Sequence, residues 1–348
     1  MYSNKNKIFS AKTVYTSQFK TIIEVLQNII PETTIIVNGK NPDDENAFYG
    51  LEISTNDVVK SMFIRLKMFG QEFSSFNSKF LRYNIDLDLS ELNNNVFKTI
   101  NSASTSIELF LNENDKQNLN ISINDDKISK ISNYKHKLMD LNYTYRKPVM
   151  TEYDVVIIMS NAEFHKTCKE KINMTNFVDI KCSEKNIIFS SAGDMTNCET
   201  IYKTNEGGIS IEWKNDISPK IVQAVFDLRN IVLFNKCNTL CPNIMILMKN
   251  DYILSIVYEI GTFSQLNISF SPVKQEYINN KSYNYSDDEN NIEDDIKLIN
   301  TINEDLSSND NEIKHKIKKE KKVKQKEENN DEQYIIKDKK SKKIKKIN

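Results

Sequence analysis

The 348-residue chain has few of the residues on which common catalytic and metal sites are built. It contains seven glycines and three histidines, and it lacks HExxH, GxSxG and GxxxxGK[ST] motifs. These absences argue against a zinc protease, a nucleophile-elbow hydrolase and a P-loop nucleotide-binding protein. We therefore expect no enzymatic activity, no cofactor and no metal site, although carboxylates that are distant in sequence could still converge in space.

The cysteines and the apolar segments exclude two further classes. Five cysteines without a CxxC pair do not suggest a disulfide framework, so we expect free thiols in a reducing compartment. Cys237 and Cys241 could meet on a helix, but with no histidine nearby we expect free thiols rather than metal ligands. No apolar run approaches the ~18 residues of a membrane span, and the first residues lack the apolar core of a signal peptide.

Charge is balanced over the whole chain but unevenly distributed along it. The 47 basic and 48 acidic residues give a net charge of −1. Residues 275–312 hold 11 acids and 2 bases, and residues 313–348 hold 15 bases and 6 acids. Because these segments have too few apolar residues to form a core, we predict a disordered, acidic-then-basic tail over 275–348. The tail is either a solvated charge run, a contact for DNA or partners, or a nuclear localisation signal.

Residues 1–274 contain four segments that read as helices. The first, 18–30, places Phe19, Ile22 and Ile23 on one apolar face and has Thr16 or Ser17 as a candidate N-cap. The others are 91–100 after a Ser90 cap, 161–172, and 228–237 after an Asp227 cap. Alternating or apolar segments between them predict strands at 33–38, 49–54, 61–69, 83–89, 106–111, 119–123, 152–159, 178–182, 186–191, 199–203, 209–213, 220–226, 244–249, 252–260 and 266–272.

The order of these segments occurs twice. Phe19 and Phe164 begin matching helices 145 residues apart, and Ser90 and Asp227 precede matching helices 137 residues apart. The simplest account is an α+β body of two similar halves, each a strand-rich layer with two short helices on one face.

Several short motifs lie in a fixed order along this body. SNYKHKLMDL occupies 132–141, Glu152-Tyr153 follows, and Glu163-Phe164 precedes Cys168. FSSAG at 189–193, IVYEI at 256–260 and a closing Pro272 complete the series. In order and spacing, from about Phe9 to Pro272, the chain resembles the eukaryotic-type DNA sliding clamp, the proliferating cell nuclear antigen (PCNA) family.

The resemblance implies an architecture and a role. It implies two clamp domains, 1–136 and 151–274, joined by an interdomain connecting loop at 137–150, with sheets outside and helices inside. Three such subunits would close head-to-tail into a ring that encircles duplex DNA without reading its sequence. The implied role is that of a non-enzymatic processivity factor that tethers DNA polymerase and other replication and repair enzymes. An ATP-dependent loader would open the ring, in the nucleus or, for a large DNA virus, at a cytoplasmic replication site.

The resemblance also implies which basic residues face DNA. They lie on the four predicted helices, and for any one of them the alternative is an ordinary solvated polar face. Lys171 lies beside two of them. The implied DNA-facing residues are Lys20, Lys98, Lys166, Lys169, Arg229 and Lys236.

Two further surfaces follow from the same resemblance. A pocket for partner peptides would lie along the connecting loop, unless its tyrosines are merely exposed loop residues. Its implied lining is Asn56, Leu141, Tyr143, Tyr145, Pro148, Ile253, Ser271 and Pro272. Subunits would join edge strand to edge strand, the alternative being edges left to solvent. The implied interface residues are Ile131, Tyr134, Cys198, Thr200 and Tyr202.

Three other functions stay open. A related processivity factor could act as a monomer or dimer without closing a ring. A nuclease with a carboxylate-bound metal would show metal-dependent cleavage of DNA. A scaffold could bind nucleic acid through its basic tail alone.

Overall fold

The computed structural model describes residues 6–101, 104–143, 145, 152–204, 208–214 and 219–273. All of them belong to one compact unit, residues 1–274. The predicted tail, Pro148 and most of the second half of the connecting loop lie outside the described residues.

The two halves contain the same elements in the same order: a strand, a helix, five strands, a helix and three strands. The first half comprises β1 (Lys7–Thr13), α1 (Thr16–Leu26), β2 (Glu32–Asn38), β3 (Gly50–Asn56), β4 (Met62–Phe69), β5 (Ser75–Ser78), β6 (Arg82–Asp88), α2 (Leu89–Asn95), β7 (Ser106–Asn112), β8 (Asp115–Asp125) and β9 (Lys130–Lys137). The second comprises β10 (Val155–Ser160), α3 (Asn161–Lys171), β11 (Phe177–Ser183), β12 (Asn186–Ala192), β13 (Asn197–Lys203), β14 (Ser210–Trp213), β15 (Ile221–Asp227), α4 (Leu228–Val232), β16 (Asn243–Met248), β17 (Leu254–Ile260) and β18 (Ser264–Phe270). The predicted α+β body of two similar halves is confirmed.

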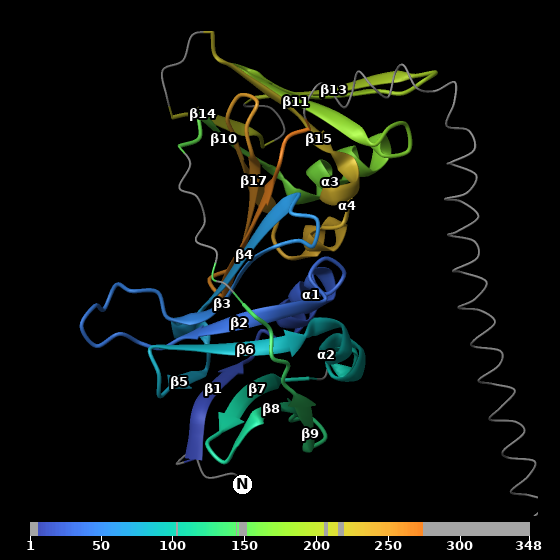
Figure 1. Cartoon of the computed structure of the whole chain (residues 1–348). Helices are drawn as coiled ribbons and strands as arrows, with labels where there is room; N and C mark the ends of the chain where they lie inside the picture. Colours follow the sequence, from blue (N-terminus) through green and yellow to red (C-terminus); the bar gives the residue numbers. More distant parts are fainter. Residues whose placement is uncertain are drawn as a thin grey trace, which may run out of the picture. The chain divides into compact units, whose positions relative to one another are not determined.

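Three antiparallel sheets follow one another along the body (Figure 1). A five-stranded sheet (β5-β1-β7-β8-β9) belongs to the first half, and a four-stranded sheet (β13-β12-β11-β15) belongs to the second. The nine-stranded sheet between them crosses from one half to the other where β18 pairs with β4. There Leu266 lies opposite Leu66 and Ile268 opposite Ile64, so buried aliphatic side chains form the connection between the halves.

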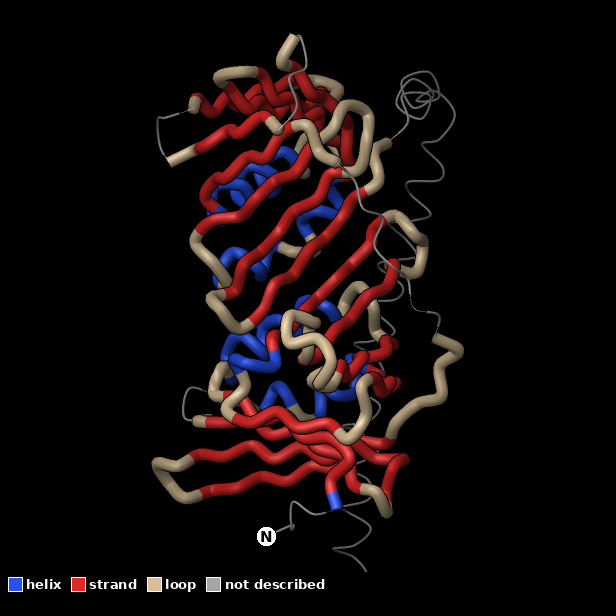
Figure 2. Tube along the Cα trace, turned by 90° about the vertical axis from the view of Figure 1, so that its left-hand side faces the viewer, coloured by secondary structure: helices blue, strands red, loops and turns tan. Residues whose placement is uncertain are grey.

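The helices form one layer on one side of the sheets (Figures 1 and 2). Helix α1 contacts α2 and the 3-10 turn η4 (Asn235–Thr239), and α3 contacts both α4 and η4. The helical layer is therefore continuous across the two halves.

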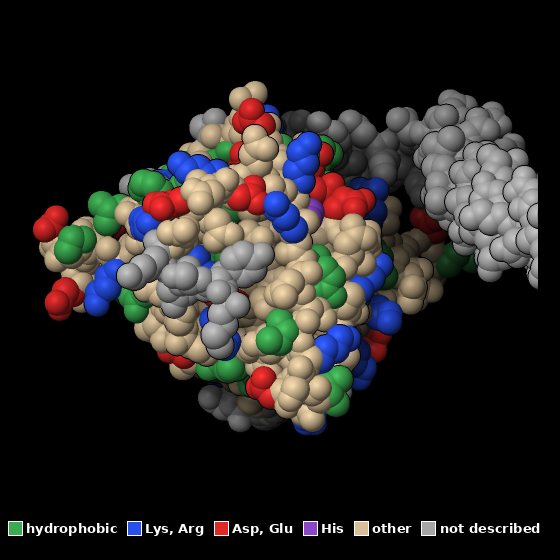
Figure 3. Space-filling view, turned by 90° about the horizontal axis from the view of Figure 1, so that it is seen from below, with side chains coloured by type: hydrophobic (Ala, Val, Ile, Leu, Met, Phe, Trp, Pro, Cys, Tyr) green, Lys and Arg blue, Asp and Glu red, His purple; other side chains and the backbone are tan. Residues whose placement is uncertain are grey.

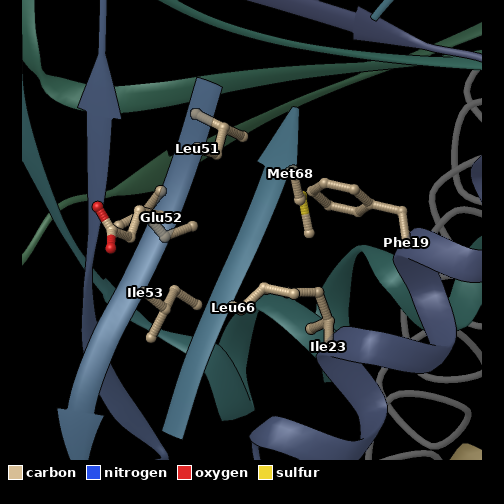
Figure 4. A pocket seen from close by; sticks show the side chains of 8 residues that line it. Phe19, Ile23, Leu51, Glu52, Ile53, Leu66 and Met68 are labelled. Atoms are coloured by element: carbon tan, nitrogen blue, oxygen red, sulfur yellow. The ribbon is translucent and has the colours of Figure 1, made fainter. Parts of the chain in front are cut away.

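The core under α1 shows how sequence periodicity produces this layer (Figure 4). Phe19 and Ile23 point from the helix toward Leu66 and Met68 of β4, whereas the carboxylate of Glu52 lies on the other side of β3. The packing leaves about 10 Å³ between these side chains, which is at the lower limit for one water. Phe164 of α3 is likewise fully buried, as the predicted repeat requires.

The helix starts differ in part from the prediction. Asp227 caps α4, accepting from the backbone N–H of Arg229 at 2.9 Å, as predicted. The predicted Ser90 cap is wrong, because Asp88 accepts from the N–H of Glu91 at 2.8 Å and Ser90 lies inside α2. The predicted Thr16 or Ser17 cap is also wrong: α1 begins at Thr16 after Tyr15, without a side-chain cap. Thr16 Oγ1 instead donates to the carbonyl of Ser104.

The other differences concern short or broken elements. The predicted helices 91–100 and 228–237 each divide into an α-helix and a 3-10 turn, η3 (Phe97–Thr99) in the first case and η4 in the second. Strands β1 and β5 are not among the predicted strands. Strand β5 has four residues, and β1 depends on pairing with both β5 and β7, so neither has a strong local signal.

Candidate nucleic-acid interface, linker groove and edge strands

All six predicted DNA-facing residues lie on the helical layer or in the turns that extend its helices. Lys166 and Lys169 are exposed one helical turn apart on α3, and neither forms an ion pair with another described residue. Lys98 is exposed after α2, and its Nζ donates to Asn94 Oδ1 at 2.6 Å. These three cations are the most available for phosphate contacts.

The other three basic residues already have partners. Lys20 donates to the carbonyl of Ile100 at 2.8 Å and lies 3.8 Å from a carboxylate oxygen of Glu24. Lys236 lies 3.9 Å from the second oxygen of the same carboxylate. Glu24 thus links the two halves of the helical layer electrostatically.

Arg229 forms a two-pronged ion pair with Asp227, and this hydrogen bonding raises the pKa of its guanidinium. Exposed acids also share the helical face, including Glu163 and Glu170 beside the free lysines of α3. The face therefore offers isolated cations rather than one strongly positive patch, which suits weak contacts with phosphates.

Lys171, by contrast, does not belong to this exposed face. It is 1% exposed, although it follows Lys166 and Lys169 on the same helix. Helical spacing explains this, because residues 164, 168 and 171 fall on one face, and Phe164 and Cys168 are both buried. That spacing is the signal that separates Lys171 from the exposed lysines.

The connecting loop is fixed to the first half by Asp86 of β6. The carbonyl of Asp86 accepts from the N–H of Met139, and its carboxylate accepts from the N–H of Leu141, both at 3.0 Å. Farther along, the hydroxyl of Tyr143 donates to the carbonyl of Ser54 at 2.7 Å. The loop therefore lies against β6 and β3, on the side of the sheet opposite the helices.

A groove of about 270 Å³ lies beside the anchored loop. It brings together Leu141 and Tyr143 from the predicted pocket, next to Asn142. Glu32, Thr33, Thr34 and Thr55 form its other wall, and the prediction missed all four, although they lie at the ends of β2 and β3. The groove is more polar than the apolar pocket that the resemblance implies.

The remaining described residues of the predicted pocket lie outside this groove. The backbone N–H of Ser271 donates to the carbonyl of Ser61, so Ser271 continues β18 beside the start of β4. Pro272 follows it, and Ile253 lies just before β17. Asn56 ends β3. The ring of Tyr145 lies 4.3 Å from the guanidinium carbon of Arg82, a cation–π contact that holds the loop against β6.

The five predicted interface residues lie on two edge strands. Strand β9 pairs only with β8, and β13 pairs only with β12, among the described strands. The strands lie at opposite ends of the body, one in each terminal sheet (Figure 1). The end of the body with the five-stranded sheet carries interspersed charges of both signs (Figure 3).

Both edge strands are attached to the helical layer in the same way. Tyr134 of β9 shares a hydrogen bond with Thr99 at 3.1 Å, and Tyr202 of β13 shares one with Thr167 of α3 at 2.6 Å. On the outward faces, Ile131 is 64% exposed and Ile201 is 49% exposed. Tyr134, Cys198, Thr200 and Tyr202 are only partly exposed, so on each edge strand the isoleucine is the exposed large hydrophobic side chain.

Other chemistry is sparse in the part of the chain that the structure describes. The five cysteines are free, as predicted, and no three His, Cys, Asp or Glu side chains in the described ranges are placed to hold a metal ion. No described helix is long and apolar enough to cross a membrane.

Comparisons with known proteins agree with this geometry. Residues 149–273 match the family model described as "Proliferating cell nuclear antigen, C-terminal domain". A probable DNA polymerase sliding clamp of Acanthamoeba polyphaga mimivirus is 24% identical over 305 residues, covering 78% of this chain but only 63% of that protein. A probable DNA polymerase sliding clamp 1 of Paramecium bursaria Chlorella virus 1 is 20% identical over 274 residues, covering 77% of this chain and 98% of that protein.

A solved structure has the same fold. The crystal structure of proliferating cellular nuclear antigen from Entamoeba histolytica matches with a TM-score of 0.67 at 18% identity, covering 77% of this chain and all of that one. The similarity in sequence and fold to the PCNA family, predicted from the motifs, is confirmed.

Proposed function

We propose that this chain, which is PCNA-like in sequence and fold, is a sliding clamp and DNA polymerase processivity factor. It has no catalytic role in this proposal. Three copies join head-to-tail into a ring around duplex DNA, and the ring tethers polymerase and other replication and repair enzymes. The observation that carries the proposal is the arrangement of two unpaired edge strands at opposite ends of a body whose helices form one continuous layer.

The edge strands support the proposed contact between subunits, because an unpaired strand offers a row of backbone donors and acceptors to another strand. Strand β9 of one copy would pair with β13 of the next, which is a heterologous contact that closes a ring when the rotation between copies allows it. The proposed interface residues are Ile131, Tyr134, Cys198, Thr200 and Tyr202.

The helical layer supports weak, sequence-independent contacts with DNA. Lys98, Lys166 and Lys169 are free to approach phosphates, whereas Lys20, Arg229 and Lys236 would first have to exchange their carboxylate or carbonyl partners. A closed ring needs no tight grip, since topology prevents it from leaving a long duplex. The mixed charge of this face is therefore compatible with sliding.

The proposal also covers the domain boundaries, the partners and the place of action. We propose domain boundaries at 1–136, 137–150 and 151–274, with a tail at 275–348. Partner enzymes would dock short peptides against the connecting loop, and an ATP-dependent loader would open the ring. The place of action would be a site of DNA replication, either the nucleus or a cytoplasmic replication site of a large DNA virus.

Two measurements test the proposal: the mass of the assembly, and its retention on circular compared with linear DNA. Light scattering of the purified full-length chain is expected to give the mass of a trimer, whereas a monomer at micromolar concentration would support the non-ring processivity factor. With a clamp loader and ATP, the protein should remain on nicked circular DNA and run off linear DNA. Equal retention on both templates would contradict encirclement.

A truncated chain separates the tail-driven scaffold from the clamp. Residues 1–274 form a compact unit, so the tail can be removed. We expect the truncated chain to load onto circular DNA, since the proposed contacts lie on the helices. If binding were lost with the tail, the scaffold would be the better account.

A further inference from the structure

The buried Lys171 on α3 has no opposite charge beside it among the described residues. Its Nζ donates to the carbonyl oxygen of Cys198 at 3.3 Å and to the Sγ atom of the same residue at 3.2 Å. An ammonium group buried without a counter-charge costs free energy. Of the two acceptor atoms, only Sγ can become an anion, so a Cys198 thiolate would neutralise Lys171.

Cys198 also differs from the other four cysteines in its access to solvent. It lies on the edge strand β13 and is partly exposed, whereas the others are buried. Burial raises the pKa of Cys168 and Cys182 to about 12 and that of Cys241 to about 11, and it raises the pKa of Cys237 as well. A thiol that is both accessible and beside a cation is the kind that reacts with oxidants.

We propose that Lys171 and Cys198 form an oxidation site that takes hydrogen peroxide and closes to a covalent bond between Sγ and Nζ. The thiolate attacks one peroxide oxygen, the O–O bond breaks, and a sulfenic acid and hydroxide result. Hydroxide removes a proton from the Lys171 ammonium, giving water. The free amine attacks the sulfenic sulfur and a second water leaves, so sulfur is oxidised and peroxide reduced by two electrons each.

The bond between Sγ and Nζ would change the position of β13, the strand through which we propose that subunits join. This consequence rests on the proposed function. Strand β13 is held to α3 by the Thr167–Tyr202 hydrogen bond and by the contact of Lys171 with Cys198. Shortening the 3.2 Å contact to a covalent bond would draw the edge strand toward the helix. The edge offered to a neighbouring copy would change, so peroxide would weaken the ring.

The chemistry is tested on the full-length protein with hydrogen peroxide, digestion by trypsin and mass spectrometry. We expect one cross-linked peptide pair that contains both residues, lacks two hydrogens and is not cleaved after Lys171. Cys182, buried on β11, serves as the internal control and should stay unmodified. Failure to find the cross-link while Cys198 stays reduced, or a disulfide from Cys198 in its place, would overturn the proposal.

Two variants assign the role of each partner. Lys171→Met keeps a long buried chain without the amine, so Cys198 should stop at the sulfenic acid, which dimedone traps. Its alkylation should also slow by about tenfold, because the nearby cation is lost. Cys198→Ser keeps the fold and should give no cross-link. An unchanged alkylation rate in Lys171→Met would contradict the proposed role of the lysine.

The assembly measurement separates this inference from the function on which it rests. We expect light scattering to show that peroxide converts wild-type trimers to smaller species and leaves Lys171→Met, which cannot form the cross-link, trimeric. Equal dissociation of both proteins would refute control through the cross-link. If the untreated chain were a monomer, the proposed ring would fail, while the cross-link would still be judged by its mass.

Discussion

At the scale of single residues, the second half contains a small cluster of buried polar side chains. The helical periodicity of the sequence does not predict it. His165 lies on α3 and is 1% exposed, and its ring shares a 3.1 Å hydrogen bond with the hydroxyl of Tyr258. Burial lowers the pKa of His165 to about 4 and raises the pKa of Tyr258 well above its usual range. Both groups are therefore held neutral, and Asn161, one turn before His165, donates to the carbonyls of Cys237 and Cys241.

The buried histidine makes stability depend on pH. The unfolded chain binds a proton at His165 below about pH 6.5, whereas the folded chain resists protonation until about pH 4. Stability therefore falls as pH is lowered, and this residue contributes about 2 kcal/mol of the loss between pH 7 and pH 5. Urea unfolding of wild type and His165→Gln at both pH values measures the difference. If both proteins lost the same amount, His165 would not be the cause.

The two free lysines of α3 give a prediction for DNA binding. Lys166→Ala with Lys169→Ala should weaken binding to duplex DNA at low salt. It should also reduce the slope of log K against log salt by about 2, since about one counterion is released per phosphate contact. Fluorescence anisotropy over a salt series measures the slope. Lys185→Ala, an exposed lysine in the β11–β12 turn, is the matched control and should leave the slope unchanged.

At the scale of single elements, capping and packing decide where each helix begins and which face is buried. Helices α2 and α4 both start at an aspartate that ends the preceding strand, Asp88 and Asp227. Each therefore turns directly from a strand of the sheet into the helical layer. This shared strand-to-helix turn is a local feature that makes the two halves alike.

The corrected cap of α2 can be tested by a pair of substitutions. Asp88→Ala should lower the free energy of unfolding by about 1 kcal/mol, because the N–H of Glu91 loses its acceptor. Ser90→Ala should change it by less than about 0.5 kcal/mol, as expected for a helical position without a capping role. Chemical denaturation of both variants gives the comparison. The reverse order of effects would restore Ser90 as the cap.

At the scale of the whole molecule, the pairing of β4 with β18 makes one body of two halves. This pairing joins residues about 200 positions apart in sequence, and the helical layer continues across it. The body consequently places β9 and β13, each an edge strand of a terminal sheet, at its opposite ends. The proposed assembly through β9 and β13 would therefore depend on the whole fold rather than on any one strand.

If subunits join through β13, an added charge should weaken assembly on that strand and not on the other edge of the same sheet. Ile201→Asp places a carboxylate on the exposed face of β13 and should shift the chain from trimer to monomer at micromolar concentration. Ile221→Asp is the matched control, because Ile221 is 41% exposed on β15, the other edge of the same sheet. Sedimentation or light scattering of both variants measures the size of the assembly. Loss of assembly in both would point to a general effect of the added charge.

The sequence by itself determined most of the element types, their repetition and the family resemblance, because these depend on local periodicity and on motif order. Phe19 and Phe164 are buried as their spacing predicts, and Asp227 caps its helix. Only the tertiary structure decided which of several capping residues is used, that Lys171 turns inward to Cys198, and that the loop groove is lined by Glu32 and three threonines. These features require contacts between distant segments, which no local pattern specifies.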